Sequence, residues 1–204
     1  MEVEIIMKLG KKLLAVALAG VLALSVLTGC SGSGSSSIDG KKIARFLSLG
    51  DSLGKNITIE YDNSLNQLAS AAMDVVKKQV GVEIKINGKS NKVTLDNAIG
   101  ENGILVHYGS NDYVIEREAN GLKAALKLEG ENRNKVVWVS LFNTKDIKGE
   151  SYALANSIFN DTHGASLTEK DIYELESGKL GYSTSGDYTM FVIIGDAAQD
   201  DAEA

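Results

Sequence analysis

The stretch FLSLGDSLG, from Phe46 to Gly54, decides how the rest of the chain is interpreted. It overlaps the apolar run IARFLSLG (residues 43–50), which has the length of a buried β-strand and stops at a glycine. A strand here places Ser52 in a turn at its carboxyl end, where a serine hydroxyl is presented as a nucleophile. The alternative is a polar turn with no chemical role.

Downstream of this stretch, the hydrophobic pattern switches between helical and strand spacing. Between residues 62 and 80 apolar residues recur at helical spacing, and Asp62–Ser64 offer an N-cap. The run KVVWVSLF (135–142) is the clearest strand. By the same criteria we expect helices at 113–130, 151–159 and 166–178, the last capped by Thr168, and strands at 82–88, 103–109 and 188–195. Short strands that alternate with helices predict an α/β fold, a three-layer α/β/α sandwich with a mostly parallel, flavodoxin-like sheet.

Small or amide-bearing residues follow three of the predicted strands. They are LGDSLG (49–54), INGKS (86–90) and HYGSND (107–112). In a parallel sheet the carboxyl ends of the strands share one edge, which is where ligands bind. A fourth polar segment, FNDTHG (159–164), carries a histidine just before the last predicted helix.

This set of segments, in this order, resembles the SGNH (GDSL) hydrolase family. The resemblance covers roughly residues 42 to 177 and implies a serine esterase or acylhydrolase. It assigns Ser52 as the nucleophile and His163 as the general base. The backbone N–H of Ser52, Gly88 and Asn111 would form the oxyanion hole. Such donors stabilise the tetrahedral intermediate by about 3–4 kcal/mol each, so we expect no metal and no cofactor.

The acidic member of the triad departs from the family pattern. The family has an aspartate three residues before the histidine, whereas this chain has Asn160 there and Asp161 only two residues before His163. Three outcomes stay open: Asp161 substitutes, the enzyme works with a Ser52–His163 dyad, or activity is impaired. The second hypothesis is therefore a catalytically impaired, surface-tethered binding lipoprotein with the same fold.

The N-terminus is typical of an exported, lipid-anchored protein. Basic residues precede the apolar run LLAVALAGVLALSVL (13–27), which is too short for a comfortable membrane span. The following LTGC (27–30) resembles the lipobox of bacterial lipoproteins, which implies lipidation of Cys30 on the extracytoplasmic face of the cell membrane. We divide the chain into a signal peptide (1–29), the lipidated cysteine with a Ser/Gly tether (30–37), an SGNH-hydrolase-like domain (38–196) and an acidic tail (197–204).

The charge of the chain bears on its partners. The full sequence has 21 Lys and Arg against 27 Asp and Glu, and removing residues 1–29, with three lysines and two glutamates, leaves a net charge of −7. An acidic domain is a poor candidate for binding nucleic acid. We expect instead an ester-bearing small molecule, a glycan carrying O-acetyl groups or a lipid ester, with the membrane as a further partner through Cys30.

Overall fold

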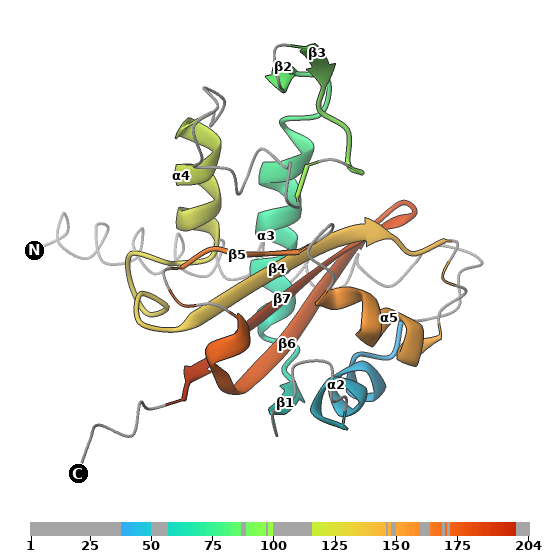
Figure 1. Cartoon of the computed structure of the whole chain (residues 1–204), viewed down its shortest axis with the longest axis vertical. Helices are drawn as coiled ribbons and strands as arrows, with labels where there is room; N and C mark the ends of the chain where they lie inside the picture. The colour runs from blue at the N-terminus through green and yellow to red at the C-terminus, as the bar shows by residue number, and fades with distance from the viewer. Residues whose placement is uncertain are drawn as a thin grey trace, which may run out of the picture. The chain divides into compact units, whose positions relative to one another are not determined.

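The computed structural model describes residues 38–49, 57–86, 89–96, 98–99, 116–145, 147, 150–159, 164–168, 170 and 172–198 (Figure 1). These ranges contain the helices α2 (Gly40–Leu49), α3 (Leu65–Lys77), α4 (Glu116–Ala125) and α5 (Ser151–Ile158) and the short 3-10 helix η3 (Ile172–Glu174). They also contain the strands β1 (Thr58–Tyr61), β2 (Glu83–Ile86), β3 (Lys89–Lys92), β4 (Val136–Asn143), β5 (Gly164–Ser166), β6 (Leu175–Ser185) and β7 (Tyr188–Ala197). The predicted helices at 62–80, 113–130 and 151–159 and the predicted strands at 135–142 and 188–195 are confirmed.

The main sheet has five strands in the order β1-β6-β7-β4-β5. Only β1 and β6 pair in parallel, and the other three pairs are antiparallel. The domain is therefore a mixed α/β fold with a mostly antiparallel sheet, and the prediction of a mostly parallel, flavodoxin-like sheet is wrong. The sheet is antiparallel at its centre because β6 and β7 form a hairpin, which places two consecutive strands side by side there.

Residues 43–49 of the run predicted as a strand lie in helix α2, and Gly50 lies outside the described residues. Ile43, Ala44 and Leu47 lie on one face of this helix and are buried, whereas Arg45 is exposed. This spacing fits a helix that covers a sheet as well as it fits a buried strand. Ser52 therefore comes after a helix in the chain and not after a strand.

The segment at 166–178, predicted as a helix, is also different. It contains the end of β5, the helix η3 and the start of β6. The β6–β7 hairpin closes through a two-residue turn in which Gly186 has a φ of +62°, and its long pairing overrides the local helical pattern. Thr168 is not a helix cap, because its hydroxyl donates to the Lys170 carbonyl oxygen at 3.2 Å.

The predicted strand at 82–88 exists in part, as β2. It pairs antiparallel with β3 in a separate two-stranded ribbon and does not join the main sheet. The predicted strand at 103–109 lies outside the described residues. The expected row of strand ends along one parallel edge is thus absent from the part of the sheet that the structure describes.

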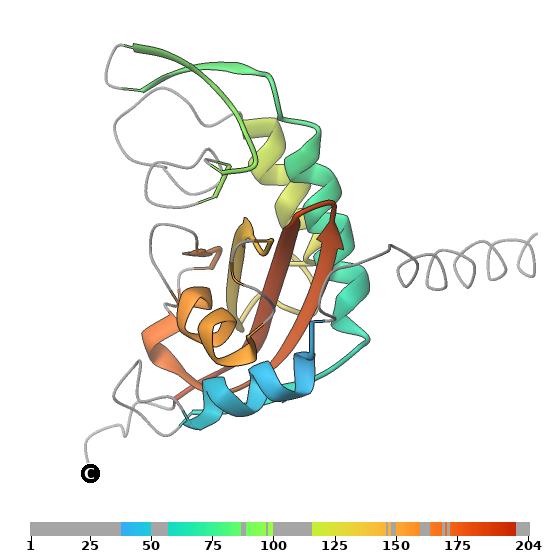
Figure 2. The same ribbon diagram turned by 90° about the vertical axis from the view of Figure 1, so that its right-hand side faces the viewer.

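Helices cover both faces of the sheet (Figure 2). On one face α3 and α4 pack over Val137, Val139 and Leu141 of β4. On the other face α2 and α5 pack over the alternate residues Val136 and Trp138. The apolar residues of β4 are buried on both faces, which explains the continuous hydrophobic run that made this strand recognisable in the sequence.

Ser48 of α2 joins that helix to the edge strand β1. Its hydroxyl accepts the N–H of Ile59 at 2.8 Å and lies 3.0 Å from the Ile59 carbonyl oxygen and 2.9 Å from that of Ala44. The free edge of β1 is therefore satisfied by one side chain at this position.

We predict that Ser48→Ala lowers the free energy of unfolding by about 1–3 kcal/mol, because both polar groups of Ile59 lose their partner. Ser157→Ala on α5 is the matched control, since the Ser157 hydroxyl donates only to Ala153 within its own helix. Urea unfolding of both variants measures the difference. Equal losses would mean that the bridge to β1 contributes nothing.

Candidate functional site

A polar cleft of about 300 Å³ lies beside the end of β1. We call it the Tyr61 cleft and define it by its six lining residues: Lys41, Glu60, Tyr61, Asp62, Asn63 and Lys179. Lys41 comes from the first turn of α2, and Lys179 comes from β6. The cleft exists because β1 pairs in parallel with β6, which brings Lys179 next to Glu60 in register.

The floor of the cleft is fixed by packing and hydrogen bonds. The ring of Tyr61 lies against Gly40, where an added Cβ would come within 2.6 Å of the ring. The Tyr61 hydroxyl accepts a hydrogen bond from Asn66 Nδ2 at 2.9 Å, and Asn66 Oδ1 accepts the N–H of Tyr182 at 3.0 Å. The hydroxyl of Tyr182 donates in turn to the carbonyl oxygen of Ile38. These contacts hold Tyr61 in one orientation.

Asp62 is the most strongly held charge of the cleft. Its Oδ1 accepts the backbone N–H and the hydroxyl of Ser64 at 2.9 and 2.7 Å, and its Oδ2 accepts from Lys179 Nζ at 2.9 Å. The hydrogen bonds from Ser64 and then from Lys179 lower the pKa of Asp62 to about 2. The same contact with Asp62 raises the pKa of Lys179. The N-cap of α3 is Ser64, and its side chain makes no capping hydrogen bond; Asp62 instead accepts from Ser64 in a turn that precedes the helix.

We predict that the carboxylate of Asp62 makes the free energy of unfolding of the domain depend on pH in the acid range. The pKa of Asp62 is lower in the folded chain than its ordinary 3.8, so its contribution is complete above about pH 4 and is lost as the pH falls through about 2. Because the pair is open to solvent, the contribution is about 1 kcal/mol or less. Asp62→Asn should be less stable than the parent chain at neutral pH and converge with it near pH 2. Asp74→Asn, on the exposed side of α3, is the matched control for the removal of one carboxylate.

Lys41 and Glu60 form the rim of the cleft. Both side chains are exposed, and they carry opposite charges. Among the described residues no ion pair involves either of them, in contrast to the pairing of Asp62 with Lys179. Besides the pair of Asp62 with Lys179, the lining of the cleft therefore presents the cation of Lys41 and the anion of Glu60 to solvent, and Glu60 also interacts electrostatically with Lys179.

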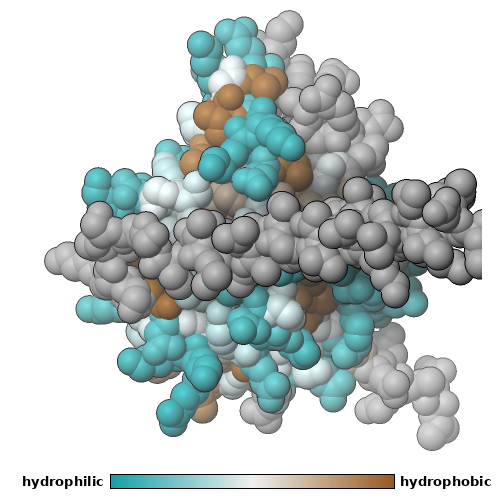
Figure 3. Space-filling model, turned by 180° about the vertical axis from the view of Figure 1, so that it is seen from behind, coloured by the Kyte–Doolittle hydropathy of each residue, from teal (hydrophilic) through white to brown (hydrophobic). Residues whose placement is uncertain are grey.

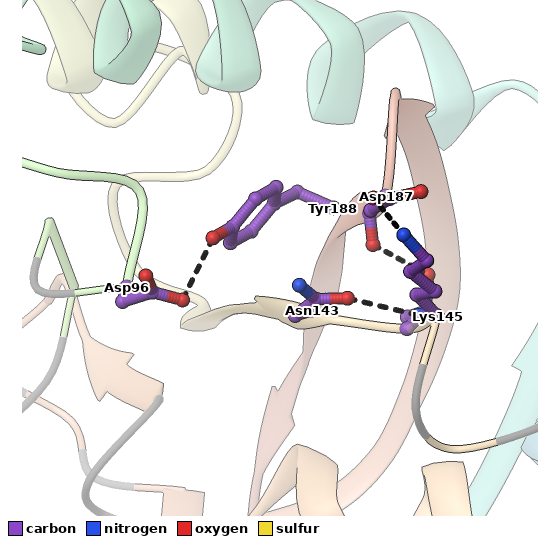
Figure 4. A network of polar contacts seen from close by, with 6 residues as sticks. Asp96, Asn143, Lys145, Asp187 and Tyr188 are labelled. Atoms are coloured by element: carbon purple, nitrogen blue, oxygen red, sulfur yellow. Dashed lines mark hydrogen bonds and ion pairs between the residues drawn. The ribbon is translucent and has the colours of Figure 1, made fainter.

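A second polar group lies at the ends of β4 and β7 (Figure 4). The hydroxyl of Tyr188 donates to Asp96 Oδ1 at 2.8 Å, which together with burial raises the pKa of Tyr188. Lys145 pairs with Asp187 at 3.3 Å, and the Lys145 N–H donates to Asn143 Oδ1. These groups satisfy one another across the hairpin end, so this network holds the hairpin in place.

The residues that the sequence predicted for catalysis and anchoring all lie outside the described residues. They are Ser52, Gly88, Asn111, Asn160, Asp161, His163 and Cys30. The fold nevertheless changes the expected arrangement of these residues. The run that precedes Ser52 is a helix and not a strand, and the strand that precedes Gly88 belongs to the separate ribbon. Within the described ranges no cluster of three His, Cys, Asp or Glu side chains could hold a metal ion, and no helix has the length and hydropathy to cross a membrane.

The sequence contained one signal for the Tyr61 cleft. The segment EYDNS (60–64) places acidic, aromatic and amide side chains together before a predicted helix, and it was interpreted only as a cap. The cationic partners come from α2 and from β6, and nothing local in the sequence brings them there.

No family model, no curated protein and no solved structure matches this chain.

Proposed function

We propose that the chain is a surface-tethered binding lipoprotein, anchored through Cys30 on the extracytoplasmic face of the membrane, which binds a small zwitterionic ligand in the Tyr61 cleft. The observation that supports this proposal is the exposed pair of opposite charges, Lys41 and Glu60, on the rim of one cleft. A free amino acid or a short peptide carries an ammonium and a carboxylate group at a few ångströms' separation. Lys41 can donate to the carboxylate, and Glu60 can accept from the ammonium group.

The other polar groups of the cleft suit binding better than bond cleavage. Asp62 accepts from Ser64 and Lys179, and its pKa of about 2 keeps it ionised, so it has no proton to give at neutral pH. Tyr61 is held by Asn66 and Gly40 and offers a rigid surface. The held ring of Tyr61 therefore costs little entropy when a ligand enters, whereas Lys41 and Glu60 must be ordered on binding.

The esterase hypothesis remains a prediction with a weaker physical basis. It relied on three strand ends that share one edge of a parallel sheet, and in the described sheet that arrangement is absent. The binding hypothesis needs no such edge, which is why we prefer it.

The ligand class can be tested with the dipeptide L-alanyl-L-alanine. We expect saturation-transfer NMR of the lipidated full chain in nanodiscs to detect this dipeptide. The same dipeptide with an acetylated amine and an amidated carboxyl group should not bind. Lys41→Glu and Glu60→Lys should each weaken binding at least about tenfold, since each removes one charged hydrogen bond. Lys42→Glu is the matched control, because Lys42 is the next residue of α2 and pairs with Asp39 outside the cleft. Equal signals from the charged and the capped dipeptide would overturn the proposed ligand class.

The two hypotheses are separated by hydrolysis of p-nitrophenyl acetate. If the chain is a binding protein, the full chain and its Ser52→Ala variant should hydrolyse this ester at the same slow rate. A Ser52-dependent turnover, together with labelling of Ser52 by a fluorophosphonate, would support the esterase and contradict a purely binding role.

A further inference from the structure

We infer that the outward face of α2 and α5 docks on the anionic surface of the membrane to which the chain is tethered. The inference rests on the lipid anchor of the proposed function, and it concerns a different surface from the Tyr61 cleft. We call this surface the α2–α5 face and define it by Lys42, Arg45, Phe46, Leu49 and Tyr152.

The α2–α5 face combines basic and apolar side chains on adjacent helices. Lys42, Arg45 and Leu49 recur at helical spacing on the side of α2 opposite its buried residues, and Leu49 is 69% exposed. On α5, Tyr152 is 61% exposed, and its ring contacts the ring of Phe46 edge-on with the centroids 5.6 Å apart. Figures 1 and 2 both show the two helices side by side at one end of the sheet.

This composition fits the interface of a bilayer. Exposed leucine and tyrosine side chains enter the boundary between headgroups and acyl chains, while lysine and arginine stay at the level of anionic headgroups. Neither α2 nor α5 contains an acidic residue. In the sequence, Asp39 and Glu150 directly precede the two helices and Asp51 follows Leu49 by two residues; Asp39 pairs with Lys42.

In the sequence, α2 follows the proposed lipidation site closely. Seven residues, Ser31–Ser37, separate Cys30 from Ile38, and α2 begins two residues after Ile38. Even a fully extended segment from Cys30 to Ile38 spans at most about 28 Å. With Cys30 in the membrane, a connection of this length gives a local concentration on the order of millimolar, so a weak contact is sufficient for docking.

The opposite side of the sheet offers a contrast. Hydrophilic residues predominate among the described residues visible there, with hydrophobic groups near the top of the view and at several places lower down (Figure 3). Ser70 on α3 is exposed and belongs to this other layer. Of the two layers, the α2–α5 face is the one that directly follows the tether, and it carries the basic and aromatic side chains together.

The test uses the lipidated full chain in vesicles of phosphatidylcholine with one-quarter phosphatidylglycerol. Cys30 is the only cysteine, so a cysteine introduced by Asn156→Cys, one turn after Tyr152, is the only free thiol once Cys30 carries lipid. An environment-sensitive nitrobenzoxadiazole label there should shift to the blue and become several-fold less accessible to iodide than the same label at Ser70→Cys. Vesicles of phosphatidylcholine alone should abolish most of this protection.

Charge reversal separates docking from anchoring. The double variant Lys42→Glu, Arg45→Glu should lower the ratio of docked to undocked chain by at least about 30-fold, while the chain still floats with the vesicles. Quenching at position 156 as strong as at position 70, or unaffected by the charge reversal, would overturn the docking inference and leave the anchor intact. Labelling of two thiols would show that Cys30 carries no lipid, and it would overturn both the docking inference and the lipid anchor.

Discussion

Replacement of Phe191 by alanine is expected to lower the free energy of unfolding by about 3–5 kcal/mol. Phe191 lies on β7, at the centre of the five-stranded sheet, and is fully buried. Its ring stacks on Phe142 with centroids 5.4 Å apart and also contacts Tyr182 at 5.9 Å. Loss of the ring leaves a cavity between the sheet and the layer formed by α2 and α5, which close-packed neighbours can fill only in part.

The measurement is urea unfolding followed by the fluorescence of Trp138. This is the only tryptophan of the chain, and it lies in the same buried cluster as Phe191. Tyr152→Ala is the control, because it removes an aromatic ring that is 61% exposed and should cost less than about 1 kcal/mol. A Phe191→Ala chain that unfolds at the same urea concentration as Tyr152→Ala would mean that β7 is not the centre of the core.

The sequence predicted those elements whose pattern has one interpretation. In α3 the apolar residues recur only at helical spacing, and β4 is a continuous run of branched and aromatic residues. The run at 43–50 has two interpretations, because Ile43, Ala44 and Leu47 fit both a buried strand and one face of a helix. Length and local composition cannot separate them, since the choice depends on the sheet that the segment covers.

The helix predicted at 166–178 is wrong because this segment pairs with residues that are distant in the sequence. At 166–178 the local pattern favours a helix, but Ser177 and Gly178 are held by β7 and by β1. Gly186 and Asp187 form the local turn signal of this hairpin. The Tyr61 cleft has the same origin, because Asp62 and Lys179 are 117 residues apart in sequence and meet only through the pairing of β1 with β6.

Gly181→Ala is expected to destabilise the fold by about 3 kcal/mol and to abolish binding in the Tyr61 cleft. Gly181 lies on β6 where the start of α3 crosses the strand. An added Cβ would come within 2.6 Å of the Leu65 carbonyl carbon and 2.9 Å of its oxygen. These are backbone atoms, so no side-chain rotation relieves the clash and the first turn of α3 must move away from the sheet.

The cleft is affected because Asp62 and Asn63 lead directly into that turn. Gly178→Ala is the matched control on the same strand, since its Cβ would meet no atom closer than 3.3 Å: the contacts are side-chain methyl groups of Ile193 and Ile59 at 3.3 Å and the Ile194 carbonyl oxygen at 3.4 Å. We expect Gly178→Ala to cost less than half as much and to leave binding of L-alanyl-L-alanine measurable. If both glycine variants lose stability equally while the dipeptide still binds to Gly181→Ala, then the contact of α3 with β6 does not position the cleft.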